Sequence, residues 1–252
     1  TVLSSWVLGA VFVIGISCWF LLKKRDKEFA VASIKIGAVF GLVASLLTVW
    51  TGDGSGYAIA QTQPMKLAAV EGYYEGQNGA GLVAVGLLNP EKKTYDDGQD
   101  PFLFRIEIPK MLSLLAERKV DAFVPGIKNI IEGGYELKDG TKALSAAEKI
   151  EKGKKAIAAL ATYRTAKKEG DEAAAKEAYT TLQENVPYFG YGYIKDVNQL
   201  VPNVPLNFYA FRVMVILGGY FILFFILVLF FAYKKDLSKI RWMQYVALWT
   251  IP

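Results

Sequence analysis

Long apolar runs alternate with polar segments along the chain, and the lengths of these runs predict its principal elements. Residues 2–22 carry no charge, residues 30–50 carry only Lys35, and residues 206–233 carry only Arg212. An α-helix rises about 1.5 Å per residue and the hydrocarbon core of a bilayer is about 30 Å thick, so each run is long enough to cross it. We therefore predict three transmembrane helices.

Both ends of the sequence fall within apolar stretches. The chain starts at Thr1 inside the first run, and a fourth apolar run begins at Trp242 and stops at Pro252. A signal peptide does not fit the first run, because its apolar stretch is too long and no basic segment precedes it. We expect the chain to be an excerpt of a larger membrane protein, in which residues 234–252 form a loop and a truncated fourth span.

The polar middle of the chain, residues 51–205, has the composition of a soluble domain. It begins with GDGSGY at residues 52–57, which we predict to be a turn because glycine tolerates positive φ. Residues 61–74 are predicted to be a helix with Pro64 in its first turn. LVAVGLL at residues 82–88 is flanked by turn residues and predicts a strand of a β-hairpin.

The remainder of the middle segment is predicted to be mostly helical. Residues 101–109 alternate in part between apolar and polar positions and predict a second strand, and residues 110–119 return to a helical pattern. Residues 141–186 are rich in Ala, Lys and Glu with a break at residues 168–171, which predicts two antiparallel helices. Their rough apolar stripe consists of Ile150, Ala156, Ile157, Leu160 and Tyr163.

Basic residues in two short loops predict the topology. KKRDKE at residues 23–28 and KKDLSKIR at residues 234–241 each contain four basic residues beside a span, which is typical of cytoplasmic loops. One crossing separates residues 51–205 from each loop, so this segment is expected on the extracytoplasmic side. The predicted fold is an all-α membrane protein, in which a transmembrane helix bundle carries a long, mainly helical loop domain with some short strand. The net charge of +5 largely reflects these loops, so the lipid bilayer and not nucleic acid is the expected partner.

Cysteine and histidine usage limits the chemistry of the chain. Its single cysteine, Cys18, lies within a span and is best interpreted as a small buried apolar residue, so no disulfide framework is expected. The chain contains no histidine. A metal site that uses histidine therefore cannot be complete within this sequence, and no histidine serves as a general base.

Two charged residues stand out in the predicted helix after the first glycines. Lys66 and Glu71 are five residues apart, which is a rotation of about 140° on a helix, so they do not form an i,i+4 ion pair. They could flank a ligand from two sides, or they could be two exposed charges on an interfacial helix. Spacing alone does not choose between these interpretations.

Two residues near the start of the third span have the same ambiguity. An arginine at the position of Arg212 can extend to the membrane interface, although an ionisable group in a span is a functional candidate. Met214 can fill space in an apolar helix, or its soft thioether can be an axial ligand of haem iron.

Three motifs, in order along the chain, resemble subunit I of cytochrome bd-type quinol oxidases. GDGSGYAIAQTQPMKLAAVEGYYE at residues 52–75 is similar to that family's GD-x-SGY turn and to the KLAA-x-E segment that opens its Q-loop. FYAFRVMV at residues 208–215 is similar to its FR-x-M motif. The resemblance covers the whole chain, from about the fifth span to the start of the eighth, although residues 141–186 fall in the variable part of the loop.

The resemblance implies roles for individual residues. Lys66 and Glu71 match the lysine and glutamate implicated in quinol binding and oxidation, with Gln63 as a weaker quinol-binding candidate. Met214 matches an axial iron ligand of a low-spin haem b, and Arg212 matches the arginine beside that haem. The resemblance also implies that the partner histidine ligand would fall immediately before Thr1, outside this sequence.

The same resemblance implies a reaction and partners. The parent protein would be a multi-pass quinol:oxygen oxidoreductase of the bacterial cytoplasmic (inner) membrane that contributes to proton motive force. It would contain further b- and d-type haems, which reduce oxygen to water, and would assemble with oxidase subunit II and with small accessory subunits. The excerpt is not expected to be active alone.

The expected chemistry is consistent with the residue types. Oxidation of a quinol releases two electrons and two protons; a carboxylate with a raised pKa can accept a proton, and a lysine or glutamine can hydrogen-bond a quinone oxygen. A membrane-anchored sensor or transporter component that binds a ligand without redox chemistry would have the same topology. It would not explain why KLAAVE and FRVM occur together.

Overall fold

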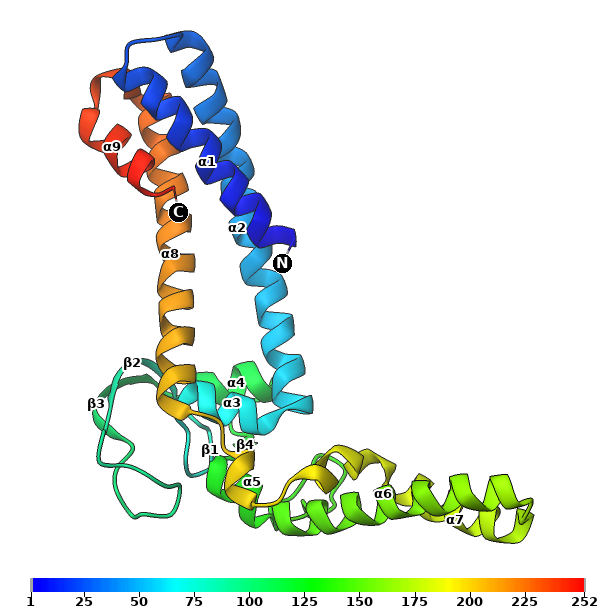
Figure 1. Ribbon diagram of the computed structural model, residues 1–252. Helices are drawn as coiled ribbons and strands as arrows, with labels where there is room; N and C mark the ends of the chain where they lie inside the picture. The colour runs from blue at the N-terminus through cyan, green and yellow to red at the C-terminus, as the bar shows by residue number, and fades with distance from the viewer. Residues whose placement is uncertain (1, 252) are drawn as a thin grey trace. The chain divides into compact units, whose positions relative to one another are not determined.

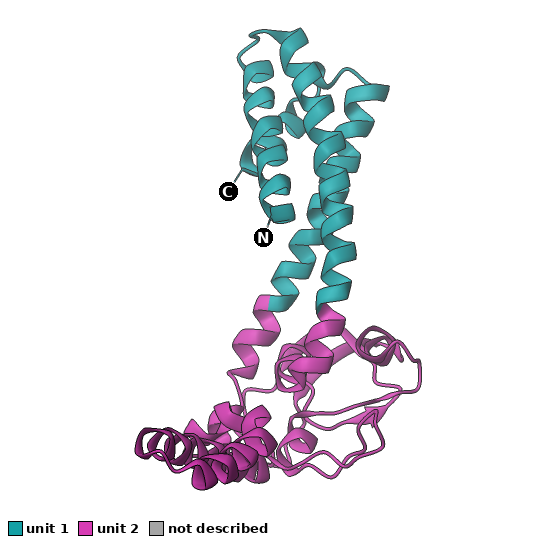
Figure 2. Ribbon diagram, turned by 90° about the vertical axis from the view of Figure 1, so that its right-hand side faces the viewer, with its two compact units in different colours: residues 1–55, 211–252 teal, residues 56–210 magenta. Residues whose placement is uncertain are grey.

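The computed structural model describes residues 2–251, which are mostly helical with a few short strands (Figure 1). The chain divides into two units (Figure 2). Unit 1 consists of Thr1–Ser55 and Phe211–Pro252, and unit 2 of Gly56–Ala210. These elements agree with the predicted all-α membrane fold.

Unit 1 contains the apolar helices. Three segments of the described chain are long and apolar enough to cross a membrane, and they correspond to the three predicted spans. The helices are α1 (Val2–Leu22), α2 (Lys27–Thr62), α8 (Val204–Lys234) and the shorter α9 (Arg241–Trp249), with a 3-10 turn at Leu237–Lys239 before α9. Their shared core includes Ile14 of α1, Ile34 of α2, Phe225 of α8 and Met243 of α9, all buried.

Helix α2 corrects the prediction for the glycine-rich stretch. Residues 52–57 are helical, and the helix continues to Thr62, so the predicted turn is wrong and residues 51–62 belong to α2. At about 1.5 Å per residue a helix of 36 residues is longer than a bilayer core is thick. Its last turns therefore extend beyond a single span.

Contacts beyond the glycines stabilise the helical end of α2. Gln61 donates a hydrogen bond from Nε2 to the backbone oxygen of Ala116 at 2.9 Å, and Ala60 is buried in a small core with Ala116 and Leu112. These contacts hold the helix on α4 (Met111–Glu117). A glycine inside a helix costs only about 1 kcal/mol relative to alanine, so tertiary anchoring of this kind can override it.

Helix α3 (Pro64–Glu71) follows α2 after one residue, Gln63. Pro64 occupies the first turn as predicted; a residue before proline avoids the α region, and the non-helical backbone of Gln63 separates the two helices. The helix is shorter than the predicted 61–74. It ends at Gly72, whose φ of 64° is left-handed and whose N–H bonds back to the carbonyls of Ala68 and Ala69.

Unit 2 contains two small antiparallel sheets, with strands where the sequence predicted them and two further short ones. The pairs are β1 (Gln77–Asn78) with β4 (Phe123–Val124), and β2 (Leu82–Leu88) with β3 (Phe102–Ile108). The predicted hairpin of strands is β2 with β3. Helix α5 (Ile127–Glu132) then packs its buried isoleucines on Ala68 and Ala69 of α3.

The predicted helical hairpin is also present. Helices α6 (Ala146–Glu169) and α7 (Glu172–Asn185) lie side by side in Figure 1, and Gly170 ends α6 with φ 77°. A Ser145–Glu148 capping box begins α6. Two 3-10 segments, Val186–Tyr193 and Val197–Leu200, lead from the hairpin to α8.

Candidate functional site

The three residues matched to quinol binding lie at the two ends of α3 in different environments. Gln63 and Lys66 are exposed at the start of the helix. Glu71, in its last turn, is only 3% exposed. The predicted pair is therefore one exposed cation and one buried carboxyl group on the same short helix, and it is not two exposed charges.

The backbone that follows Glu71 is fixed from several sides. A Cβ atom built on Gly72 would lie 3.0 Å from the Phe102 ring and 3.2 Å from the Phe208 ring, so this position fits glycine alone. The carbonyls of Tyr73 and Tyr74 accept hydrogen bonds from the first N–H groups of α5, at Ile127 (3.0 Å) and Lys128 (2.9 Å). The end of α3 is thus held between α5 and β3.

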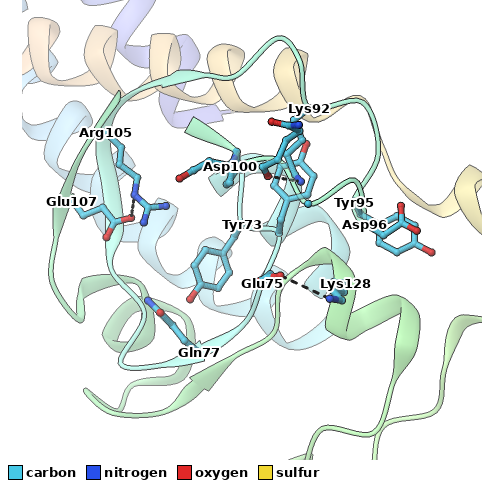
Figure 3. A pocket seen from close by; sticks show the side chains of 15 residues that line it. Tyr73, Glu75, Gln77, Lys92, Tyr95, Asp96, Asp100, Arg105, Glu107 and Lys128 are labelled. Carbon is cyan, nitrogen blue, oxygen red and sulfur yellow. Dashed lines mark hydrogen bonds and ion pairs between the residues drawn. The ribbon is translucent and has the colours of Figure 1, made fainter. Parts of the chain in front are cut away.

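A polar cavity of about 460 Å³ begins at Gly72, directly after Glu71 (Figure 3). It is enclosed by the segment after α3, by the loop between β2 and β3, by β3 and by the start of α5. The lining does not include Gln63, Lys66 or Glu71. Its side chains that carry charge are Glu75, Lys92, Asp96, Asp100, Arg105, Glu107 and Lys128. This mixture of donors and acceptors suits water and small polar groups better than an apolar tail.

One wall of the cavity is the loop between β2 and β3, which is organised around Asp97. The Asp97 carboxylate accepts a hydrogen bond from Lys92 Nζ at 2.8 Å and others from the N–H groups of Lys93, Thr94 and Gln99. These bonds hold the pKa of Asp97 well below its usual range, and the bond from Lys92 has the largest effect. The Lys92 ammonium also lies 4.6 Å from the centre of the Tyr74 ring.

The opposite wall combines an ion pair with a buried phenol. Arg105 Nε and Glu107 Oε1 are 2.9 Å apart, because residues two apart in β3 project from the same face. Burial, followed by the nearby Glu107 carboxylate, raises the pKa of Tyr73 to about 12. Tyr73 points toward Gln77 in Figure 3 and stays protonated at physiological pH.

No pattern in the sequence indicates this cavity. Its residues come from four separate segments between Gly72 and Lys128, and no spacing rule connects a β-hairpin loop to the start of a helix that follows it. Local patterns predicted β2, β3, α4, α6 and α7, but they did not predict the short strands β1 and β4 or the helix α5. The elements around the cavity are also joined by the pairing of β1 with β4. Each of these strands has only two residues, which is too short for alternation to predict it.

In unit 1, Met214 lines an apolar cavity of about 370 Å³ between α1, α2 and α8. Its side chain is 58% exposed within the chain, although it belongs to a membrane-spanning helix. The wall of the cavity is formed by Ser4, Val7, Leu8, Val11, Ser45, Thr48, Val49, Leu217, Gly218 and Phe221. Gly218 lies one turn after Met214 and leaves the helix surface open beside it.

These residues fit one side of a haem site. The thioether of Met214 is a soft donor of the kind that binds haem iron, and its surroundings are almost entirely apolar, as a porphyrin requires. The chain contains no histidine, so it can supply one of the two axial ligands expected. Among residues 2–251 no cluster of three or more His, Cys, Asp or Glu side chains provides a different kind of metal site.

Arg212 does not share this cavity lining. It is 9% exposed, and its guanidinium lies 5.6 Å from the centre of the Phe211 ring. Positions two apart on a helix differ by about 200°, so Arg212 and Met214 leave α8 in different directions. The burial of Arg212 argues against the interpretation in which its side chain extends into the membrane interface.

The comparisons with known proteins agree with the motifs. The sequence profile of the cytochrome bd terminal oxidase subunit I family matches residues 1–252. The chain is 31% identical over 270 residues to cytochrome bd-II ubiquinol oxidase subunit 1 of Escherichia coli (strain K12), covering 100% of this chain and 48% of that protein. It therefore spans about half the length of this relative.

Two further similarities are partial. The chain is 31% identical over 130 residues to a putative cytochrome bd menaquinol oxidase subunit I of Bacillus subtilis (strain 168), covering 50% of this chain and 28% of that protein. The bd oxidase structure from Geobacillus thermodenitrificans matches with a TM-score of 0.45 and 18% identity, over 93% of this chain and 56% of the other. Since the family profile covers its whole length, the chain is a multi-pass membrane protein that belongs to the cytochrome bd terminal oxidase subunit I family.

Proposed function

We propose that this chain forms the quinol-oxidising part of subunit I in a terminal respiratory oxidase. In this proposal membrane quinol is oxidised at α3, and its electrons pass to a low-spin haem b held in part by Met214. They then pass to b- and d-type haems outside this sequence, where oxygen is reduced to water. Support comes from the family match over the whole chain and from the environments of Glu71 and Met214.

The burial of Glu71 is the observation that carries the quinol assignment. Only 3% of Glu71 is exposed, so its carboxyl group at the end of α3 is withdrawn from bulk water. In the proposed reaction a carboxylate oxygen of Glu71 takes a proton from a quinol hydroxyl. This is the general-base role that quinol oxidation requires.

Lys66 and Gln63 have a different proposed role. Both are exposed at the start of α3, and both can donate a hydrogen bond to a quinol or quinone oxygen. They would orient the head group so that its hydroxyl meets the carboxyl group at the other end of the helix. Positioning of this kind lowers the entropic cost of the reaction.

Met214 supplies the proposed axial ligand at the apolar cavity between α1, α2 and α8. A haem bound there provides a one-electron acceptor for quinol oxidation. Arg212 contributes a fixed positive charge in a largely buried position, which electrostatically favours a centre that has gained an electron. The remaining lining residues exclude water from the site.

Location and partners follow from the same proposal. The basic loops at residues 23–28 and 234–241 support an extracytoplasmic position for the loop domain in the bacterial cytoplasmic membrane. Protons released from quinol would then leave on that side and contribute to proton motive force. Oxidase subunit II and small accessory subunits are the proposed protein partners.

The substrate is proposed at the level of the quinol class. The Escherichia coli relative is named for ubiquinol, and the Bacillus subtilis relative described above is named for menaquinol. The donors of Gln63 and Lys66 suit any quinol head group, because both classes present the same two hydroxyls.

The test is a redox assay of the full-length protein purified with its partner subunits. We expect reduced-minus-oxidised spectra of b-type haem and oxygen consumption that depends on added quinol. A purified complex without haem and without quinol-dependent oxygen consumption would contradict the proposal. That result would favour the sensor or transporter alternative, in which the same loop domain binds a ligand without redox chemistry.

A further inference from the structure

The β2–β3 hairpin of unit 2 has two unlike faces. One face contributes buried Val83, Leu88 and Phe102 to a small core and presents Arg105 and Glu107 to the polar cavity. Side chains of directly paired residues lie on the same face of a sheet. The pairs Val85–Ile106 and Leu87–Phe104 alternate with Gly86–Arg105, so they belong to the other face.

This second face is apolar and exposed. Val85, Leu87, Phe104 and Ile106 are each more than half exposed. The register shift next to Leu88 leaves Leu103 without a direct partner, and Leu103 is 61% exposed as well. We call these five residues the apolar hairpin face. Aliphatic and aromatic side chains gathered in this way mark a surface that contacts something other than water.

The hairpin is attached to the first turns of α8. The rings of Phe102 and Phe208 are 5.5 Å apart in an edge-to-face arrangement, and the N–H of Leu88 donates a hydrogen bond to the Tyr209 hydroxyl at 3.0 Å. Phe208 is completely buried in this core. Figure 1 shows β2 and β3 beside the start of α8.

The position of these contacts along α8 gives their depth. After Arg212 the helix has no charged residue until Lys234, and the twenty residues from Val213 to Ala232 span about 30 Å, the thickness of a hydrocarbon core. Phe208 precedes Val213 by five residues, or about 7.5 Å. On a helix that crosses the bilayer over Val213–Ala232, this position falls in the headgroup region, which extends several ångströms beyond the core on each side.

We propose that the apolar hairpin face inserts into the lipid headgroup and acyl boundary on the loop side of the membrane. The hairpin is held at this level by Phe208 and Tyr209, and its five exposed side chains are of the type that interfacial elements bury in lipid. Arg105 and Glu107 are on the opposite face, so no charge has to leave water. This inference does not depend on quinol oxidation or on haem binding.

Lipid fits the surface better than a protein partner does. The five residues include no hydrogen-bond donor or acceptor in their side chains, whereas the surfaces that recognise protein partners usually include a polar rim. The surface is also continuous with the entry point of a helix that spans the bilayer. A protein partner is therefore treated as an alternative result of the experiment.

The experiment measures the surroundings of a nitroxide spin label in the full oxidase reconstituted into liposomes. Labels are attached at Leu87→Cys, Phe104→Cys and Ile106→Cys, with Lys93→Cys in the adjacent polar loop as the matched control. Other accessible cysteines of the complex are replaced, while buried Cys18 is not expected to react. Power saturation compares collisions with oxygen, which concentrates in lipid, with those of a water-soluble nickel chelate.

We expect an oxygen-to-nickel collision ratio several-fold higher at positions 87, 104 and 106 than at position 93. A ratio equal to that at position 93 would mean that the face is in water and would overturn the proposal. Labels shielded from both reagents would mean that protein covers the face, which would overturn it as well. Haem content and quinol oxidase activity check that each variant assembles. Because three positions are labelled, the test can still be read if one variant fails to assemble.

Discussion

The hydroxyl of Tyr209 accepts a hydrogen bond from the N–H of Leu88 at 3.0 Å, and this bond joins β2 to the first turns of α8. Leu88 is 9% exposed, so its N–H has little access to water as an alternative partner. The bond connects the loop domain to a membrane-spanning helix by a contact that neither segment's local pattern contains.

Tyr209→Phe removes this acceptor and retains the ring. We expect a local destabilisation of about 1–2 kcal/mol, which corresponds to roughly 5- to 30-fold faster hydrogen exchange in β2, because a buried N–H is left without its partner. Mass-spectrometric hydrogen exchange of the full complex measures this. Tyr193→Phe, at an exposed position of the same unit, is the control and should leave β2 unchanged. Equal exchange in both variants would contradict the role of the bond.

Gly72→Ala tests the end of α3. Any Cβ at a positive φ costs about 1–2 kcal/mol, and at Gly72 it would also press on the rings of Phe102 and Phe208. The control is Gly140→Ala. Gly140 also has a positive φ, of 79°, but a Cβ added there would have no atom within 4 Å, so this substitution carries the backbone cost alone. We expect Gly72→Ala to lower the thermal unfolding midpoint of the loop domain more than Gly140→Ala does. Equal shifts would show that the packing around Gly72 is unimportant.

The depressed pKa of Asp97 predicts how the loop between β2 and β3 responds to acid. Its pKa is depressed, so its stabilising contribution is complete above about pH 4, the ordinary range of an aspartate, and is lost only as the pH falls further, toward the folded-state pKa. Limited proteolysis of the loop should therefore be slow and constant from pH 7 down to pH 4. Asp97→Asn should be cleaved faster across that whole range. Asp96→Asn, which removes the neighbouring carboxylate, should behave like the unmodified protein.

Met214→Leu tests the proposed iron ligand. Leucine keeps the apolar volume but removes the thioether, so the spectrum of the low-spin haem in the assembled oxidase should change. Met243→Leu is the matched control, because Met243 is buried in the core of unit 1 and does not line the cavity. An unchanged low-spin spectrum in Met214→Leu would rule out ligation by this residue.

The sequence predicted the elements better than their ends. The three apolar runs, the two strands of the hairpin and the α6–α7 pair were found where length, alternation and composition placed them. The turn at residues 52–57 was wrong, because glycine permits a turn without requiring one. Contacts of Ala60 and Gln61 with α4 keep the stretch helical until Thr62, and the bond from Gln61 to Ala116 joins residues 55 apart in the chain.

The candidate site was predictable only in part. Lys66 and Glu71 were identified from a motif, but their spacing could not indicate that one is exposed and the other buried. That difference arises when α5 and the β2–β3 hairpin pack against α3, which is a tertiary event. The exposure of Met214 toward an apolar cavity likewise depends on how α1 and α2 pack beside α8.

In the proposed mechanism, Glu71 accepts a proton during quinol oxidation. Stopped-flow mixing of the oxidised full complex with quinol, followed by the absorbance of haem b, measures this step directly. Glu71→Gln keeps the size of the side chain and removes its basic form, and Glu132→Gln at an exposed position of α5 is the control. We predict that Glu71→Gln contains a normal amount of haem that quinol no longer reduces, while Glu132→Gln is reduced at the normal rate. Normal haem reduction by quinol in Glu71→Gln would contradict the account.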